Sequence, residues 1–422
     1  MPDAAGTRPG DRALAVGLGL AAFALYLGIG LSLHFQAPRL FHYLDQVFDA
    51  DVPARVIDLT RPQGPHHRTH YHPLLVVLLN PLGFGLRAVF RGLGLEQAGR
   101  VAAIVLCAAA GGLTVGLFSV LLGRLGLARL PRGLWTLVFA LSASQLVFAS
   151  VPESWAFSGL ALVGLFVLGA RPRPPRDGLV LAGAAAFGMA VTNLAAAVLV
   201  RARWLLDGGR AAALRGLLRY VLLVLLVTAL VGTLGALVYP GATPFYRLDR
   251  LARDDRLSFV RTLEPSVLAR RGTAVAAHLL FFNLAAPRIL VTETGTPRTA
   301  VDFPDPSPGM LRPAGVGHAV AWAAVLVLAA SALVRGGREP LLLVLALWVA
   351  LQAALHLVFG TSLFLYSCQW TSSLVALAAA GTNLRLGASR AQSAIAAGLA
   401  LLQAATNGPF LREVLLHFSE LR

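Results

Sequence analysis

Acidic residues gather in one segment near the start of the chain, where their spacing suits acid–base chemistry. The segment 33–75 contains Asp45, Asp49, Asp51 and Asp58. Asp45 and Asp49 share a face if the segment is helical, whereas Asp49 and Asp51 share a face only if it is extended. A carboxylate that is held ionised beside a hydroxyl acts as a general base. The candidate catalytic residues are therefore Asp45, Asp49 and Asp51, and the choice among them stays open.

Asp51 also has a structural interpretation. Val52 and Pro53 suit the first turn of a helix that residues 55–59 would continue, and aspartate is a favoured residue at the N-cap position. Asp49 has no comparable local role, which makes it the acid with the greater freedom to act on a substrate.

Six of the ten histidines lie in the same segment, and four of them form the motif HHRTHYH. Imidazole is a common zinc ligand, and the nearby aspartates could complete a metal site. The alternative is a cationic collar in which Arg68, His70 and His72 bind a phosphate or lie among lipid headgroups. The motif has neither a ligating cysteine nor a helical His-x-x-x-His pair with a catalytic glutamate. No metal ligands are therefore assigned, while a divalent metal cofactor is left open.

Three further polar motifs border apolar stretches. Glu153, in SVPESW, is expected at the tip of a helical hairpin, as a helix cap or as a buried functional acid. Asn193 interrupts the apolar segment 178–204, and His356 and Tyr366 flank an expected outer helix connection in HLVFGTSLFLYSCQW. A tyrosine at such a place is more often an interfacial anchor than a ligand. The candidate substrate-binding residues are Arg68, His70, His72, Glu153, Asn193, His356 and Tyr366.

The elements that must position these residues belong to a polytopic membrane protein. Of the 422 residues, 57% are hydrophobic and 13% are charged, whereas a soluble domain usually has about 25% charged residues. The net charge of +16 comes from 36 basic residues, all of them arginine, and 20 acidic ones. Because the arginines lie between apolar runs, they indicate membrane topology and not a nucleic-acid partner. Cys107 and Cys368 lie within apolar stretches and are interpreted as small core residues.

Apolar runs and their arginine flanks predict about eleven membrane segments, with a cytoplasmic N-terminus and an outer C-terminus. The segment 178–204 should bend near Thr192 and Asn193 into two short helices, because both of its flanks are rich in arginine and one straight span would place one flank outside. Segments 74–90 and 273–290 should lie along the outer surface. The runs that can each span or nearly span are 13–33 (an uncleaved anchor), 101–122, 134–149, 156–170, 220–239, 315–334, 340–359, 363–380 and 391–405.

The expected fold class is all-α integral membrane, with a single domain over 1–422 and no separate soluble domain. Juxtamembrane helices are expected on the outer surface within the first and middle outer loops. The richness in Ala, Gly, Leu, Val and Arg suggests a GC-rich bacterial genome, and hence a bacterial cytoplasmic (inner) membrane. The predicted outer loops are 34–99, 240–314 and 406–422.

The order of these motifs resembles the GT-C superfamily of polytopic glycosyltransferases, which includes protein O-mannosyltransferases and lipid A aminoarabinose transferases. An anchor helix is followed by an acidic outer-loop motif and a His-Pro-Leu surface helix, and the architecture matches over nearly the whole chain. The acidic pair of that superfamily is more commonly Asp-Glu, and here it is Asp-Ala-Asp, so the resemblance does not separate Asp49 from Asp51. The short matching motifs are FDAD (48–51), YHPLL (71–75), VPESW (151–155), VTN (191–193), His356 and FLYS (364–367).

The resemblance implies a polyprenyl-phosphate-linked sugar as donor and a glycan, lipid or protein as acceptor. Asp49 or Asp51 would deprotonate an acceptor hydroxyl that attacks the sugar with inversion, while cationic side chains hold the departing lipid phosphate. Membrane lipids are the remaining expected partners. The main alternative is a transporter or flippase of lipid-linked or anionic cargo, since broken helices also form transport sites. That class does not explain why the acids and histidines collect in one outer loop.

Overall fold

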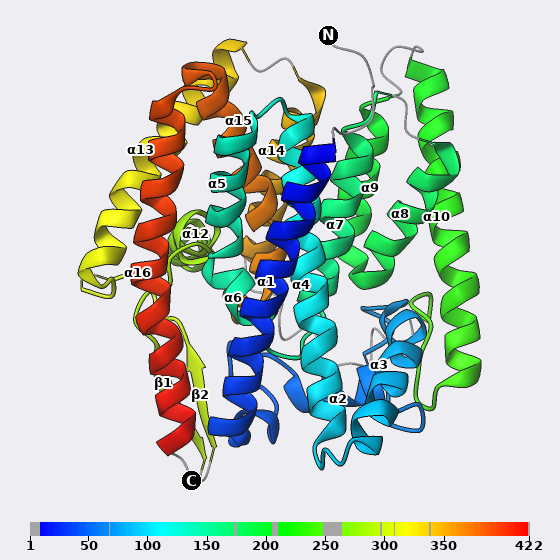
Figure 1. Cartoon of the computed structure of the whole chain (residues 1–422). Helices are drawn as coiled ribbons and strands as arrows, with labels where there is room; N and C mark the ends of the chain where they lie inside the picture. The colour runs from blue at the N-terminus through cyan, green and yellow to red at the C-terminus, as the bar shows by residue number, and fades with distance from the viewer. Residues whose placement is uncertain are drawn as a thin grey trace.

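The computed structural model describes residues 9–66, 68–172, 175–204, 210–247, 264–295, 298–307, 309–336 and 339–420, which are mostly helical (Figure 1). Long helices run between two ends of the molecule, and α1 begins at the end opposite to the one where α16 finishes. The longest helices are α1 (Pro9–Gln36), α4 (Ala98–Arg124), α10 (Arg210–Val238), α13 (Pro313–Gly336), α14 (Pro340–Val358) and α16 (Arg390–Glu420). Shorter helices are α5 (Arg129–Ala140), α6 (Ala143–Phe148), α7 (Trp155–Gly169), α8 (Arg176–Met189), α9 (Leu194–Ala202), α12 (Pro265–Ala277) and α15 (Thr371–Leu386).

Seven of the described helices are long and apolar enough to cross a membrane, namely α1, α3 (Leu75–Gly92), α4, α10, α13, α14 and α16. Large apolar side chains cover their outer faces; Leu222, Leu230 and Val327 are 64%, 60% and 71% exposed. Such surfaces are stable against lipid and not against water. The chain is therefore a multi-pass membrane protein, and the number of eleven segments stays a prediction.

The predicted bend in the segment 178–204 is confirmed. Helix α8 ends at Met189, a short 3₁₀ turn covers Val191–Asn193, and α9 follows directly. Ala190 has the extended backbone angles φ −158° and ψ 127°, which interrupt the helix. Broken backbone of this kind is tolerated at membrane depth where protein surrounds it.

Two predicted boundaries are wrong. The run 134–149 is divided between α5 and α6, because Ser142 starts a new helix and its Oγ accepts a hydrogen bond from the Gln145 N–H at 3.4 Å. The predicted outer loop 406–422 is helical as far as Glu420. There Phe410, Val414 and Phe418 recur every four residues and are buried on one face, so the helix continues past the apolar run.

The expected all-α fold is interrupted at one place, within the segment 240–314. Strands β1 (Leu290–Gly295) and β2 (Arg298–Asp302) form an antiparallel hairpin in which Leu290 lies opposite Asp302. The segment before α2 joins its edge: Phe48 N–H donates to Val301 O at 2.8 Å, and Val301 N–H donates to Gln46 O at 2.8 Å. These bonds join two segments that lie about 250 residues apart in the sequence.

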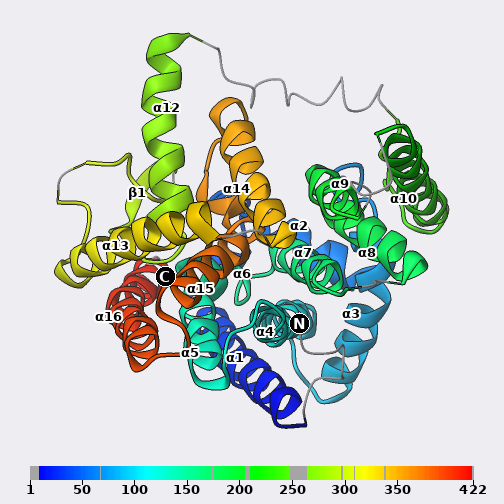
Figure 2. The same ribbon diagram turned by 90° about the horizontal axis from the view of Figure 1, so that it is seen from above.

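The hairpin, α3 and the helix α2 (Val52–Thr60) lie at the end of the molecule where α16 finishes (Figure 1). Helix α12 is seen end-on in Figure 1 and lengthwise in Figure 2, so it runs across the long helices. It is not among the seven helices that are long and apolar enough to span. This end of the molecule therefore contains the elements that carry the candidate residues.

A group of phenylalanines anchors the segment before α2 to these elements. The Phe48 side chain is fully buried, and its ring centroid lies 4.8 Å from that of Phe303, 4.7 Å from that of Phe364 and 6.0 Å from that of Phe410. Aromatic pairs at such separations stabilise beyond the area they bury. The backbone next to Asp49 is thereby fixed by packing from three distant parts of the chain.

Candidate active site

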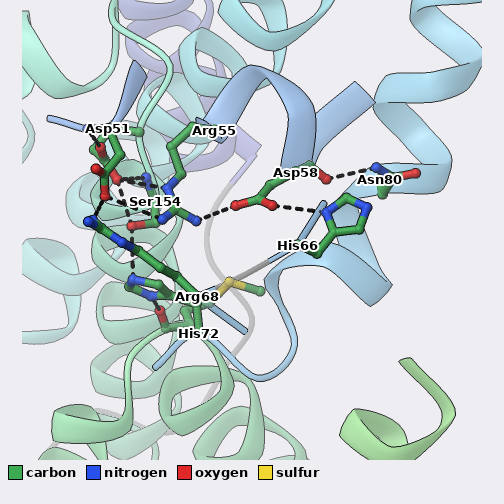
Figure 3. A network of polar contacts seen from close by, with 10 residues as sticks. Asp51, Arg55, Asp58, His66, Arg68, His72, Asn80 and Ser154 are labelled. Atoms are coloured by element: carbon green, nitrogen blue, oxygen red, sulfur yellow. Dashed lines mark hydrogen bonds and ion pairs between the residues drawn. The ribbon is translucent and has the colours of Figure 1, made fainter. Parts of the chain in front are cut away.

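A buried network of charged side chains lies along one face of α2 (Figure 3). Asp51, Arg55 and Asp58 lie four and three residues apart, so they share that face. The Arg55 side chain is only 2% exposed; its guanidinium pairs with Asp58 and lies 3.5 Å from Asp51 Oδ2. Asp51 occupies the N-cap position of α2, but its side chain makes no capping hydrogen bond. Its carboxylate instead pairs with Arg68.

Glu153 joins the turn before α7 to the start of α2. Glu153 Oε2 accepts a hydrogen bond from the Asp51 N–H at 2.8 Å, and Oε1 accepts from the Ser154 N–H at 2.7 Å and from Ser154 Oγ at 2.8 Å. Oε1 also lies 3.5 Å from Arg55 Nε. Glu153 thus satisfies backbone donors at the starts of two helices, as a capping residue does, and is also a buried partner of an arginine.

The histidine motif splits between separate partners. His66 Nδ1 lies 2.9 Å from Asp58 Oδ1, and His72 Nδ1 donates to Met189 O at 2.6 Å (Figure 3). Burial, with a contribution from Arg55, lowers the pKa of His72 to about 3, so this imidazole is neutral at physiological pH.

His70 is the third histidine of this motif among the described residues. His70 is buried and packs against Tyr71, with ring centroids 4.1 Å apart. His67 lies outside the described residues. Within the described ranges, no group of three His, Cys, Asp or Glu side chains is arranged to hold a metal ion.

Asp49 belongs to a second acidic group, formed with Asp302. Thr361 Oγ1 donates to Asp49 Oδ2 at 2.5 Å, and the next residue, Ser362, donates through Oγ to Asp302 Oδ1 at 3.1 Å. Burial, together with smaller effects of the nearby charges of Asp49 and Asp305, raises the pKa of Asp302 to about 6. Two carboxylates with such different environments are typical of sites that handle protons. Asp49 itself is only partly buried, so its carboxylate can be reached.

The backbone that presents Asp49 is strained. Phe48 and Asp49 both have positive φ, at 51° and 63°, as does Asp45 at 61°. Aspartate visits this left-handed region more readily than most residues, but a phenylalanine there is an outlier. Such outliers persist where the surrounding structure fixes them, and they concentrate at functional sites. Asp45 is exposed, and its N–H donates to Ala50 O at 3.1 Å, which closes the turn.

A cation on α12 orders the connection that carries Thr361 and Ser362. The Arg271 guanidinium donates to the carbonyl oxygens of His356 at 3.0 Å, Phe359 at 3.2 Å and Gly360 at 2.6 Å. These carbonyls form the C-terminal end of α14 and the start of the connection, where a cation is favourable. Arg271 therefore helps to position the two hydroxyls that hold Asp49 and Asp302.

A row of rings joins the network at α2 to the end of α14. Trp155 lies between His72 and Tyr366, at centroid separations of 5.6 and 4.9 Å, and Tyr366 lies 4.6 Å from His356. His356 Nδ1 lies 3.3 Å from Phe359 O. Within the described part of the chain, His356 Nε2 and Asp51 Oδ1 are buried without a hydrogen-bond partner. Buried polar atoms of this kind need an explanation, and contact with a bound substrate would supply one.

Asn193 closes the helix break and does not join the acidic groups. Its Nδ2 donates to Ser158 Oγ at 2.9 Å and to Ala186 O at 3.1 Å, and its Oδ1 accepts from Gln369 Nε2 at 3.3 Å. These bonds pair the buried Asn193 amide and join the helix break to α7 and to the residues before α15. Asn193 therefore has a structural role that accounts for its burial.

The structure thus sorts the sequence candidates into groups. It brings Asp51, Arg68, His72 and Glu153 together, gives Asp49 a different hydrogen-bond partner in Thr361, and links His356 and Tyr366 through the row of rings. Sequence reasoning missed the partners Arg55, Asp58, Ser154, Asp302, Thr361 and Ser362. The signals in the sequence were the spacings of four residues from Asp51 to Arg55 and of three residues from Arg55 to Asp58. Comparisons of the chain with protein-family models, with curated proteins and with solved structures gave no match.

Proposed function

We propose that this protein is a membrane glycosyltransferase that moves a sugar from a polyprenyl-phosphate-linked donor to an acceptor hydroxyl on the outer side of a bacterial cytoplasmic membrane. In this proposal the end that carries α2 and the hairpin faces outside, and the N-terminus is cytoplasmic. The observation that carries the proposal is Asp49: a reachable carboxylate on strained backbone, oriented by Thr361 and coupled to the buried Asp302.

Asp49 is the better general base of the Asp-Ala-Asp motif. The Asp51 side chain is 6% exposed and pairs with Arg68, so its charge serves the buried network. Asp49 is partly buried and has an oriented carboxylate, as a base that must meet a substrate hydroxyl requires. Asp51 is then a positioning residue that holds the start of α2 and, through it, the strained turn before it.

The reaction is a single displacement. Asp49 takes the proton of the acceptor hydroxyl as its oxygen attacks the anomeric carbon from the face opposite the phosphate. The bond between that carbon and the phosphate oxygen breaks, its electron pair leaves with the lipid phosphate, and the anomeric configuration inverts. Arg68, whose side chain is 36% exposed, is the cation best placed to hold the phosphate, because the guanidinium fork matches its oxygens.

Radiolabelled polyprenyl-phosphate sugar in proteoliposomes tests the proposal. The proposal expects the label to pass to a water-soluble or lipid acceptor with release of the polyprenyl phosphate, and the product to have the inverted anomeric configuration. The break between α8 and α9 is the observation that favours the competing flippase class. Movement of intact donor across the bilayer without any glycosylated product would contradict the glycosyltransferase and support the flippase.

A further inference from the structure

Four arginines line a cavity on the other side of α2 from the charge network. The cavity has a volume of about 730 Å³ and lies between α2, α3 and the start of α4. Glu96 is the acidic residue among its lining residues. The basic residues of the lining are Arg61, Arg87, Arg91, Arg100 and His42.

The cavity is separate from the candidate active site because α2 has two different faces. Pro53, Val56 and Ile57 face the cavity, whereas Asp51 and Arg55 belong to the charge network. Residues three and four apart share a helix face. The first set therefore lies on one face of α2, and the second set lies on another. The arginines of the cavity therefore have no part in the network described above.

Two of the arginines are held in place. Arg87 donates to Thr60 O at 3.3 Å, and the Arg100 guanidinium lies 5.5 Å from the centre of the Phe41 ring. Burial, followed by the charges of Arg100 and Arg39, lowers the pKa of His42, which disfavours a protonated imidazole beside the arginines. Arg61 and Arg91 are exposed at the rim. A preorganised cluster of guanidinium groups with one acid is suited to a multivalent anion.

The surroundings of the cavity indicate where that anion comes from. Helix α3 and the residue after it expose apolar side chains next to the arginines, including Leu82 at 58%, Val89 at 58% and Leu93 at 73%. Exposed apolar residues beside arginines are typical of a helix at the boundary between lipid and water. In Figure 2, α3 lies at the edge of the helix array, where lipid can reach it.

We propose that this cavity binds a phosphate group, presented by the headgroup of an anionic phospholipid. The guanidinium groups of Arg61, Arg87, Arg91 and Arg100 would surround the phosphate oxygens, and the acyl chains would lie against the apolar side of α3. This inference does not depend on the proposed glycosyl transfer, because it uses a different face of α2.

The test titrates the purified full-length protein in neutral detergent with phosphatidylglycerol or with phosphatidylcholine, and counts bound lipid by native mass spectrometry. The double variant Arg61→Gln/Arg91→Gln removes two exposed charges from the rim. Each arginine near a lipid surface contributes enough to change affinity about fivefold, so the double variant should bind phosphatidylglycerol about 25-fold more weakly. The matched control is Arg270→Gln/Arg412→Gln, which removes two exposed arginines elsewhere and should bind like the wild type.

A second arm titrates inorganic phosphate into the same three proteins by calorimetry. Binding of phosphatidylglycerol that weakens only in the rim variant supports the proposal. A different result is that inorganic phosphate binds more weakly only to the rim variant and phosphatidylglycerol does not bind. This result supports the phosphate site and overturns the lipid as the source of the phosphate. Equal weakening in the rim and control variants, or no weakening in a rim variant that melts like the wild type, overturns the site.

Discussion

Arg55 is the residue on which the charge network at α2 depends. Its guanidinium pairs with Asp51, Asp58 and Glu153, and all four side chains are almost inaccessible to solvent. Removing one partner of a buried ion pair leaves charge without compensation. Arg55→Met should therefore destabilise the protein by about 3–5 kcal/mol. Thermal unfolding in detergent measures the loss, and Arg55→Lys, which keeps the charge without the fork, should lose less. An unchanged melting temperature of Arg55→Met would contradict the network's role.

Asp302 gives the stability of the protein a defined dependence on pH. Its pKa rises from the ordinary value of 3.8 to about 6 in the folded protein, mainly because of burial. A raised pKa means that the folded state binds the proton more tightly than the unfolded state. The contribution of protonated Asp302 to the free energy of unfolding is therefore complete below about pH 4. This contribution, up to about 3 kcal/mol, is lost as pH rises through about 6.

Asp302→Asn does not titrate, so its stability relative to the wild type should improve between pH 4 and pH 8. Melting temperatures of both proteins across this range measure the difference. Asp305→Asn is a control for the loss of a nearby charge, and should retain most of the dependence because burial is the larger cause. Parallel curves for the wild type and Asp302→Asn would contradict the assignment.

The sequence could single out the acids of the segment 33–75 as candidates, but it could not predict the different surroundings of Asp49 and Asp51. Asp49 and Asp51 are two residues apart, and no local pattern separates their surroundings. Their difference comes from Glu153, which is 102 residues from Asp51, and from Thr361, which is 312 residues from Asp49. Side-chain directions that depend on such distant partners cannot be derived from local spacing.

At the scale of elements, α2 and α3 meet at a glycine. A Cβ atom at Gly83 would collide with the carbonyl oxygen of Leu59, whereas a Cβ atom at Gly85, on the same helix, would meet nothing within 4 Å. Gly83→Ala should therefore force the two helices apart and destabilise the protein by about 1–3 kcal/mol. Gly85→Ala should be neutral or stabilise by up to about 1 kcal/mol, because alanine favours the helix. Thermal unfolding of the two variants gives the comparison, and equal melting temperatures would exclude close packing at Gly83.

The elements differ in how well the sequence predicted them. The bend at Thr192 and Asn193 was predicted because charge on both flanks is a local feature of the chain. The β-hairpin was missed because its edge pairs with the first outer loop, through Val47 and Val301. The end of α16 was missed because an apolar run marks lipid contact, whereas its last turns are held by burial of Phe410 and Phe418 against protein.

At the scale of the whole molecule, the proposed orientation places the two ends of the bundle on opposite sides of the membrane. Thr292 on β1 and Ala388 before α16 are both exposed, and the elements they adjoin lie at opposite ends in Figure 1. The native Cys107 and Cys368 are buried. Thr292→Cys should react with a membrane-impermeant maleimide in spheroplasts, and Ala388→Cys only after the membrane is permeabilised. The reverse pattern would invert the orientation and place the candidate site in the cytoplasm.

The assignment of Asp49 as general base is the central claim, and the rate of sugar transfer by Asp49→Asn tests it most directly. General bases contribute about 100-fold or more to a rate. Asp49→Asn should therefore lose at least about 100-fold in transfer from labelled polyprenyl-phosphate sugar while it melts like the wild type, and Asp45→Asn, in the same turn, should keep most of its activity. Wild-type transfer by Asp49→Asn would contradict the account.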